Sequence, residues 1–499
     1  MPEIWCIALT TEGISACSLN AAMESRNYSQ PWPLMRKYGV LCVDSTVVLR
    51  MTARALHELN RGRNGEVRGI ALLTPELETA VFADSKGVPA SPVFVESPLT
   101  IPKSGIPEKY AEMPETSNAY RNSVLRRIQQ VEPTFGMNGV YGIWSLGALV
   151  MHGLCGNALD ACSPRGMKLG YVSDDMDELI WLALGVNQSS SSRRVRPGTA
   201  AGKLSGTCIA TLPADDFPEL YDLAGIPIFC MGTANGAAAY AMAANALSWA
   251  VTVGTRISAR WNAGNTALSA YEIQIVDKPA NGDETSAPNA TEEMTSNEWT
   301  QHFDEQLSLN TEPGPGKTLT TYGYATDSFS SPILMHSIQS LVDAETGRIP
   351  MKAFKPAPVG SCGLHCLFNA YGWQITGLQS AHEPAHLDRA LFEGMIFELR
   401  TWRETVSNDG LAPVRMCVEK PWPPESAQWA ADILGESVYY IDDTEGSLAS
   451  FGGALALIRS LGINLSATPK LQAHVLEPSG RFASYQPHYA IHRYLKENK

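Results

Sequence analysis

The sequence predicts an α/β protein of two lobes. Short apolar runs typical of β-strands alternate along the chain with segments whose apolar residues recur at helical spacing. No internal repeat or long low-complexity tract interrupts this alternation. With 499 residues, the chain is also too long for a single hydrophobic core.

The first half of the chain begins with the pattern of a β-hairpin. Ile4–Leu9 is a short β-type run, the next four residues favour a turn, and Ile14–Leu19 is expected to return antiparallel. Ser45–Leu59 has apolar residues at helical spacing. Arg68–Leu73 and Thr79–Ala83 then predict two further strands.

Later segments continue the alternation. Ser145–Leu154 and Asp175–Leu184 are typical of amphipathic helices. Pro227–Thr233 predicts an apolar strand followed by an alanine-rich helix, and a second apolar strand ends at Gly254 and Thr255. Residues 277–296 are rich in Pro, Gly, Asn, Thr and Glu, which favours an exposed, flexible insertion in the second lobe.

Charge and cysteine usage narrow the class of partner. The chain has 38 basic and 51 acidic residues, a net charge of −13, which argues against nucleic acid or an anionic membrane as a partner. We expect a small-molecule partner instead. The ten cysteines include no CxxC pair, and residues 1–13 lack a basic leader, so we expect a cytoplasmic protein with reduced thiols. The sequence leaves open whether the chain forms a homodimer.

Four segments resemble parts of the FGGY carbohydrate kinases, and they follow one another along the chain in the same order as in that family. They are the stretch from Pro227, RPGTAAGKL at residues 196–204, RALFEGMIFELR at residues 389–400, and QWAADILG at residues 428–435 with the strand and small-residue helix that follow. The resemblance implies two ribonuclease-H-like domains, over residues 1–247 and 248–499, that face an interdomain cleft. In that family ATP is held mainly on the second lobe and the sugar mainly on the first.

The residue that carries the chemistry of this family is missing. The family's first turn usually contains Gly-Gly-Gly-Asp-Asn, whose Asp takes the proton from the attacking sugar hydroxyl. The matching position here is Ala234, followed by Asn235. A methyl group cannot accept a proton, so the resemblance implies the fold without its usual catalytic base.

The two phosphate loops also depart from the family. Its Asp-x-Gly-Thr motif, whose acid organises Mg²⁺, aligns with a segment in which Ala8, Thr10 and Thr11 stand at the motif positions. Glu12 follows, and a carboxylate about 4 Å from a phosphate oxygen would repel it by roughly 4 kcal/mol at an effective dielectric of 20. The second loop keeps Gly254 and Thr255 but continues with Arg256 and Ile257, where the family usually has Ser and Gly.

The nucleotide and sugar contacts are altered as well. The family's Gly-Gly-Gly-Ala, against which adenine lies, aligns with residues 418–421, where Glu419 and Lys420 bring in long side chains. Its sugar-binding Gln-Met-His-Gly aligns with residues 76–79, which include Glu78. An ordinary divergent sugar kinase would not lose all of these groups.

We therefore expect a repurposed kinase fold, a pseudokinase with respect to phosphotransfer. Its cleft would catalyse an ATP-independent cyclisation, isomerisation or elimination on a small organic molecule, as in specialised metabolism. The residues expected to matter fall into three groups: Glu12, Asn235 and Arg256 as catalytic residues; Thr10, Thr11, Gly254 and Thr255 as remnant phosphate loops; and Glu78, Glu419 and Lys420 along the substrate cleft. Only Glu12 has an evident role, as a general acid or base. No cofactor or metal is expected.

Two alternatives stay open at this level. One is an active ATP- and Mg²⁺-dependent sugar or polyol kinase whose base and metal ligands come from other residues. The other is a non-catalytic protein that binds a metabolite or a partner chain. Only analogy with the family places the candidate residues in a cleft.

Three further strings resemble functional motifs. His382 to His386 matches the zinc-binding pattern HExxH, but Pro384 favours a helix that begins there and leaves His382 outside it. Residues 314–318, GPGKT, are expected to form an ordinary loop. Cys362, His365 and Cys366 are close enough in sequence to bind a metal, although we expect partly buried loop residues.

Overall fold

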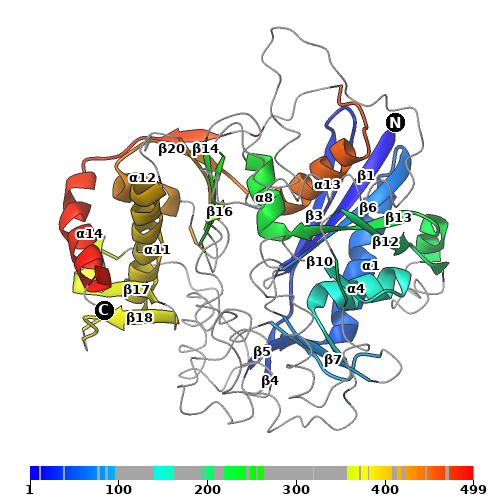
Figure 1. The fold of residues 1–499 in the computed structure, drawn as a ribbon, viewed down its shortest axis with the longest axis horizontal. Coiled ribbons are helices and arrows are strands. Elements are labelled where there is room, and N and C mark those ends of the chain that lie inside the picture. Colours follow the sequence, from blue (N-terminus) through cyan, green and yellow to red (C-terminus); the bar gives the residue numbers. More distant parts are fainter. Residues whose placement is uncertain are drawn as a thin grey trace. The chain divides into compact units, whose positions relative to one another are not determined.

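The computed structural model describes the chain in two compact units. The described residues are 1–10, 13–37, 40–75, 79–84, 88–95, 140, 142–161, 193–195, 198–206, 218–242, 248–253, 257–262, 318–319, 357–369, 372–379, 381–406, 413–418, 422–423, 425–443, 447–466, 471 and 473–497. The first unit contains the elements from β1 to α8 together with α13, and the second contains the other elements (Figure 1).

The first unit is built on a six-stranded sheet with the order β12-β13-β6-β1-β2-β3. The strands β1, β6 and β13 run parallel, and β2, β3 and β12 are antiparallel to their neighbours. Their bounds are Pro2–Leu9 (β1), Gly13–Asn20 (β2), Ser25–Pro31 (β3), Glu66–Thr74 (β6), Thr199–Lys203 (β12) and Pro227–Thr233 (β13). The expected hairpin is therefore confirmed.

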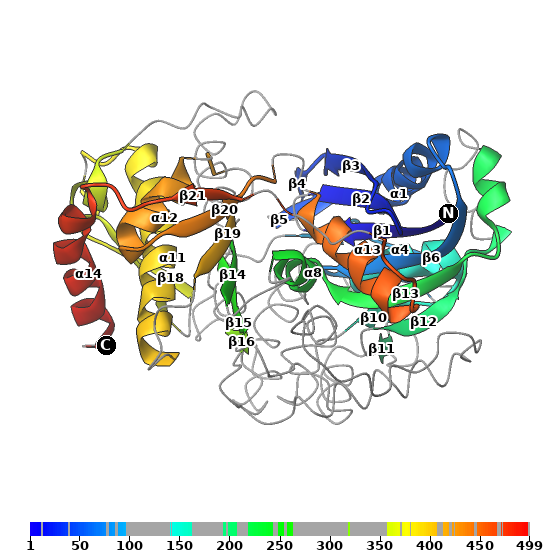
Figure 2. The same cartoon turned by 90° about the horizontal axis from the view of Figure 1, so that it is seen from above.

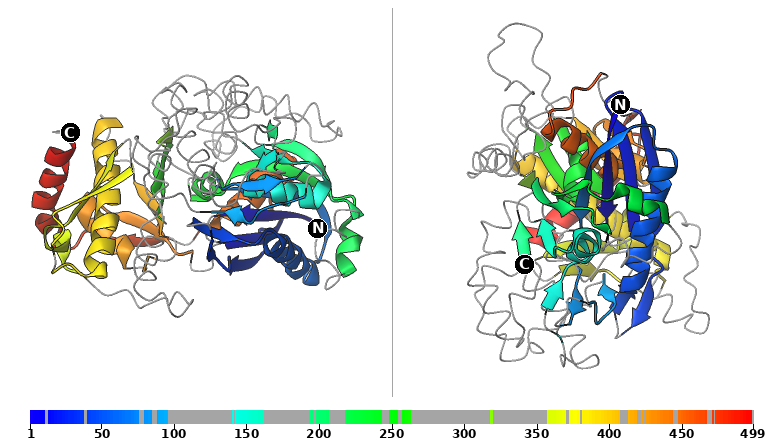
Figure 3. Two further views of the ribbon diagram at one scale, coloured as in Figure 1. Left: turned by 90° about the horizontal axis from the view of Figure 1, so that it is seen from below. Right: turned by 90° about the vertical axis from the view of Figure 1, so that its right-hand side faces the viewer.

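Helices cover both faces of this sheet (Figure 3). They are α1 (Ser45–Arg61), α4 (Leu146–Cys155), α8 (Ala234–Met242) and α13 (Leu448–Ser460), with a short 3₁₀ helix at Pro218–Leu223. Helix α1 begins where the Asp44 carboxylate accepts hydrogen bonds from the amides of Thr46 and Val47, as expected of an N-cap. Helices α8 and α13 pack together on one face, against Cys6, Leu73 and Met231. On the other face Arg26 reaches a main-chain carbonyl of α1.

Short strands complete the described part of the first unit. They form a three-stranded sheet of Met35–Lys37 (β4), Val40–Val43 (β5) and Val93–Phe94 (β8), and two pairs, Val81–Ala83 (β7) with Gly142–Trp144 (β9) and Leu159–Ala161 (β10) with Arg193–Val195 (β11).

The second unit repeats the strand order of the first. Its sheet has the order β16-β15-β14-β19-β20-β21, in which β14, β19 and β20 are parallel. The bounds are Ser248–Val253 (β14), Ile257–Asn262 (β15), Thr318–Leu319 (β16), Val414–Val418 (β19), Val438–Ile441 (β20) and His474–Leu476 (β21). In both units an antiparallel three-strand meander leads into two parallel strands, and a sixth strand is antiparallel at the far edge.

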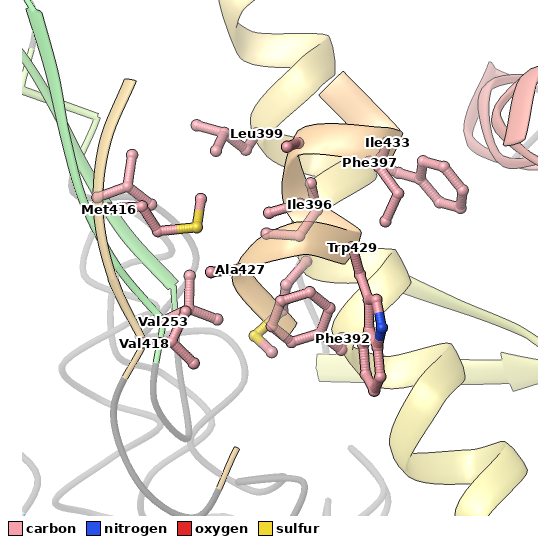
Figure 4. Packing of buried hydrophobic residues seen from close by; sticks show 14 of the residues in the cluster. Val253, Phe392, Ile396, Phe397, Leu399, Met416, Val418, Ala427, Trp429 and Ile433 are labelled. Atoms are coloured by element: carbon pink, nitrogen blue, oxygen red, sulfur yellow. The ribbon is translucent and has the colours of Figure 1, made fainter. Parts of the chain in front are cut away.

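Helices α11 (Pro384–Val406), α12 (Ser426–Leu434) and α14 (Phe482–Glu497) belong to the second unit, with the 3₁₀ segment η8 (Val359–Gly363) and the hairpin of β17 (His365–Asn369) and β18 (Gly372–Thr376). The core of this unit lies between its sheet and α11 and α12. Figure 4 shows Met416 and Val418 pointing from β19 toward Ile396 and Ala427 on the two helices.

One segment differs from the division expected from the sequence. Residues 445–470 fall in the range assigned to a second domain, but they belong to the first unit. Within that unit α13 packs along β1 and β2 and against α8 (Figure 2). The described residues of the first unit therefore come from two separate stretches of the chain. The expected insertion at 277–296 and the expected helix at 175–184 lie outside the described residues.

Candidate functional site

The parallel strands of the first unit end together at one edge of its sheet. Strand β1 ends at Leu9, β6 ends at Thr74 and β13 ends at Thr233, and Thr74 lies opposite Thr233 in the register of β6 and β13. In open α/β sheets, ligands bind outside the carboxyl ends of the strands. This edge is the candidate site of the first unit.

The transition from β13 to α8 forms the centre of this edge. Gly232 has a φ of +100°, a conformation that glycine adopts without strain. The Thr233 hydroxyl then accepts a hydrogen bond of 3.1 Å from the amide of Gly236, which caps the helix. Ala234 is the first helical residue and is only 4% exposed. A buried methyl group therefore occupies the position at which the family resemblance implies the catalytic base.

Two further threonines belong to this edge. The Thr10 hydroxyl donates to the carbonyl of Gly13 over 3.2 Å and accepts from the amide of Gly13 over 3.1 Å, so it closes the turn of the β1–β2 hairpin. The indole of Trp32 donates to the Thr10 carbonyl over 2.9 Å. The Thr10 hydroxyl, expected in a remnant phosphate loop, thus has a structural role in this turn.

Thr74 differs from Thr10 in its hydrogen bonding. Its residue is 2% exposed, and its hydroxyl oxygen is buried with no hydrogen-bond partner in the described part of the chain. A buried hydroxyl without a partner costs about 1–3 kcal/mol of desolvation. Such a group is able to bond a ligand at little additional cost. Thr74 was not among the residues expected in the site. Its one signal in the sequence is its position at the end of the apolar run GIALLT, where a strand is expected to end.

Most of the other residues expected in the site are not among those that the structure describes. Thr11, Glu12 and Glu78 lie outside the described residues, as do Gly254, Thr255, Arg256, Glu419 and Lys420. The backbone of Asn235 belongs to α8, while its side chain is outside the description. In the second unit, β14 and β19 end side by side at Val253 and Val418, directly before two of these undescribed segments.

The carboxyl edge of the second unit's sheet contains acidic residues. Strand β20 ends at Ile441 and is followed by Asp442 and Asp443. Burial, and then the nearby Asp442, raise the pKa of Tyr440 to about 12. This phenol is therefore neutral at physiological pH.

The HExxH string does not form a helical zinc motif. As expected, α11 begins at Pro384, so His382 precedes the helix. The His382 Nδ1 accepts from the amide of Gln379 over 2.8 Å, and its Nε2 lies 3.3 Å from the carbonyl of Cys362. A carbonyl only accepts, so this Nε2 carries the proton and both ring nitrogens are occupied.

The other two sequence motifs do not form functional sites in the described residues either. Cys362 is exposed on η8, whereas His365 and Cys366 lie on β17 and are not the loop residues expected from the sequence. Successive strand residues point to opposite faces, so His365 and Cys366 diverge. Burial raises the pKa of the Cys366 thiol well above its usual range. Within the described ranges, no three His, Cys, Asp or Glu side chains are grouped to hold a metal ion. In GPGKT, only Thr318 is described, at the start of β16.

The described helices were also compared with the length and apolar composition that a membrane span requires. Among the residues that the structure describes, no helix has both the length and the apolar composition required to cross a bilayer.

Comparison with solved structures identifies the fold. The ligand-bound xylulose kinase from Lactobacillus acidophilus is 14% identical and has a TM-score of 0.56, and the alignment covers 100% of this chain and 98% of that one. The xylulose kinase from Rhodospirillum rubrum is 14% identical with a TM-score of 0.60 and coverage of 99% and 98%. The glycerol kinase from Plasmodium falciparum, solved with ADP, is 12% identical with a TM-score of 0.55 and the same coverage.

These likenesses confirm the expected fold class, two actin-like, ribonuclease-H-like domains as in FGGY kinases. At such identities they establish the fold alone. Neither the protein-family models nor the curated proteins contain a match to the chain.

Proposed function

We propose that this kinase-fold protein does not transfer phosphate from ATP and instead acts on a small organic molecule without a nucleotide. The observation that carries the proposal is Ala234. It is buried at the first position of α8, directly after β13, where a kinase of this fold needs a carboxylate. The reaction class that we propose is cyclisation, isomerisation or elimination, in which orientation and exclusion of water supply the rate acceleration.

The described residues at the edge of the first unit do not fit a magnesium nucleotide. They present the hydroxyls of Thr10, Thr74 and Thr233 and the methyl of Ala234. Mg²⁺ is usually bound through carboxylates and substrate phosphates. The hydroxyls of Thr10 and Thr233 are already engaged in the turn and the helix cap, but the unpartnered Thr74 hydroxyl fits an uncharged, oxygen-bearing molecule, because a hydroxyl can donate to or accept from a carbonyl or alcohol.

The uncharged character of the described side chains at this edge also favours a second candidate, a non-catalytic metabolite-binding protein. None of the described side chains at this edge is an acid or base that titrates near neutral pH, and general acid–base catalysis needs one. The catalytic proposal depends on Glu12, Asn235 and Arg256, whose side chains lie outside the described residues. The two candidates therefore differ in whether bound ligand is converted.

A calorimetric titration with MgATP, combined with an assay of ADP release, tests the proposal. We expect neither nucleotide binding nor ADP release above the blank in the presence of pentoses, polyols and gluconate. Turnover would refute the proposal and establish an active kinase. Nucleotide binding without turnover would refute the ATP-independent role and favour regulation. A panel of small oxygenated metabolites, screened by thermal shift and then by mass spectrometry for conversion, separates catalysis from binding.

The variant Ala234→Asp gives a sharper test. It restores a carboxylate at a helix N-terminus, where negative charge is tolerated. We expect it to fold and to release no ADP, because the aligned metal and adenine motifs are also altered. ADP release by Ala234→Asp alone would show that those motifs still work. Ala234→Asn, which matches the shape without the charge, is the control for any change in folding.

A further inference from the structure

Helix α14 packs onto the second unit through a cluster of histidines. It contacts α11, α12, η8 and β17 (Figure 1). Three imidazoles gather there: His365 of β17, and His488 and His492 of α14. The ring centres of His365 and His488 are 5.9 Å apart, and the His492 ring lies 5.3 Å from the ring of Phe397 on α11. His492 is 1% exposed.

The buried carboxylates in this region already have cationic partners. Glu398 is fully buried, its Oε1 lies 3.2 Å from His492 Nε2, and its Oε2 accepts from Lys496. Glu393 accepts from the Arg389 Nε over 2.7 Å and from the amide of Gly360 over 3.2 Å.

Of the other two imidazoles, His488 interacts electrostatically with the Glu393 carboxylate, whereas His365 has no such partner among the described residues. In the described part of the chain, no carboxylate lies within ion-pair distance of His365, and the buried Nδ1 of His488 has no hydrogen-bond partner. A proton added to His365 therefore enters a site with other imidazoles nearby and no counter-charge of its own.

The contact between α14 and η8 also holds a strained turn. Gly360, Ser361 and Cys362 all have positive φ, at 72°, 47° and 57°. Such a conformation costs a non-glycine residue roughly 1–2 kcal/mol. The turn is fixed by Glu393 and by the ring of His488, which lies so close to Gly360 that a Cβ there would overlap it. Loss of α14 would remove one of these two restraints.

We propose that α14 is an acid-sensitive latch, which protonation of His365 beside His488 releases from η8 and β17 at mildly acidic pH. The elements packed together here carry further ionisable groups: His386, Asp388, Arg389, Glu393, Glu398, Arg400, Arg403 and Glu404 on α11, Asp432 on α12, Cys362 on η8, Cys366 on β17, and Tyr485, Tyr489, Arg493, Tyr494, Lys496 and Glu497 on α14.

The direction of the pH effect follows from His365. Burial, followed by the proximity of His488 and His492, lowers the pKa of His365 from 6.5 to about 4. The released state, with an ordinary pKa, binds a proton more readily than the packed state. The packed state is therefore fully favoured above pH 6.5 and loses that advantage as the pH falls toward 4. Full expression of the shift would change the equilibrium between packed and released α14 by about 30-fold at pH 5, and solvent screening of this partly buried ring reduces the change to about tenfold.

Asp388 opposes this trend in the global stability. Burial raises its pKa to about 7, so the folded protein gains stability as Asp388 takes up a proton below that pH. The opening of α14 must therefore be measured on α14 itself and not through the stability of the whole protein. Hydrogen exchange of the full chain at pH 7.5 and 5.0, corrected for intrinsic rates, reports opening of peptides over residues 482–497, with peptides from α1 as the internal reference.

We expect opening of α14 to increase about tenfold at pH 5.0 relative to α1. His365→Gln should abolish most of this response, while His474→Gln, on the exposed strand β21, should keep it. A wild-type response below twofold, or a full response in His365→Gln, would overturn the proposal. If His365→Gln does not fold, histidine-selective NMR of the wild-type protein decides, because a His365 pKa of 6.5 or higher removes the basis of the latch.

Discussion

Two buried threonines of the first unit differ in a way that has a measurable effect on stability. Thr74 has an unpartnered hydroxyl at the carboxyl edge of the sheet, whereas Thr52 of α1 is 0% exposed and donates to the carbonyl of Val48 over 2.9 Å. Each can be replaced by valine with almost no change of shape. The pair therefore isolates the cost of an unsatisfied hydroxyl.

We expect Thr74→Val to increase the free energy of unfolding by about 1 kcal/mol relative to Thr52→Val. Urea unfolding followed by far-UV circular dichroism measures this difference. Under the proposed function, Thr74→Val should also weaken binding of the small molecule, because a residue kept at a cost in stability commonly serves a site. A lower stability for Thr74→Val than for Thr52→Val would show that the Thr74 hydroxyl has a partner after all.

At the scale of elements, α13 depends on two adjacent glycines. A Cβ on Gly452 would overlap the main-chain carbonyl of Ala237 in α8, and a Cβ on Gly453 would lie 2.6 Å from the Cys6 sulfur. The close approach of α13 to α8 and β1 therefore favours glycine at both positions. Because a main-chain atom cannot rotate away, the restriction at Gly452 is the stricter one.

We expect Gly452→Ala to lower the free energy of unfolding by about 1–3 kcal/mol, in spite of the better helix propensity of alanine. Gly453→Ala should cost less, because it meets the side chains of Cys6 and Leu73. Gly206→Ala is the control in the same unit, since no described atom beyond its chain neighbours lies within 4 Å of its added Cβ. If Gly452→Ala were as stable as the Gly206 variant, α13 would pack less closely than described.

Local elements could be predicted from the sequence because their signals are local. The β1–β2 hairpin and α1 followed from periodicity and turn residues, and the start of α11 followed from Pro384. The position of α13 could not be predicted, because the pattern of a small-residue helix does not state which sheet it joins. His365 was expected in a loop and lies on β17, because a short mixed sequence carries little strand signal.

The candidate site was predictable only in part. The burial of Ala234 directly after β13 agrees with its expected position. The hydroxyl of Thr10 was expected in a remnant phosphate loop, but the structure shows it closing a turn, which depends on distances that a sequence does not contain. The unpartnered hydroxyl of Thr74 likewise emerges only when its surroundings are known.

At the scale of the whole molecule, the connectivity of the first unit leads to a prediction about fragments. A chain ending at residue 247 contains the sheet and α1, α4 and α8 but lacks α13. Its apolar face, with Ile4, Cys6 and Leu73, would lose the cover of Leu455 and Leu457. We expect this fragment to aggregate or to bind a hydrophobic dye, and co-expression of residues 445–470 to restore a soluble, cooperatively unfolding protein.

Size-exclusion chromatography and thermal unfolding of the two preparations check this expectation. As a control, residues 471–499, which include α14 of the second unit, should not rescue the fragment. A monomeric 1–247 fragment with a sharp unfolding transition would contradict it.

The same connectivity sets an order of events during synthesis. The ribosome releases β1 first, yet the helix that covers this strand emerges more than 430 residues later, which takes tens of seconds at about 5–20 residues per second. Throughout that interval the nascent first unit exposes an apolar surface of the kind that chaperones recognise. The part of the polypeptide that is made earliest is thus among the last to be completed.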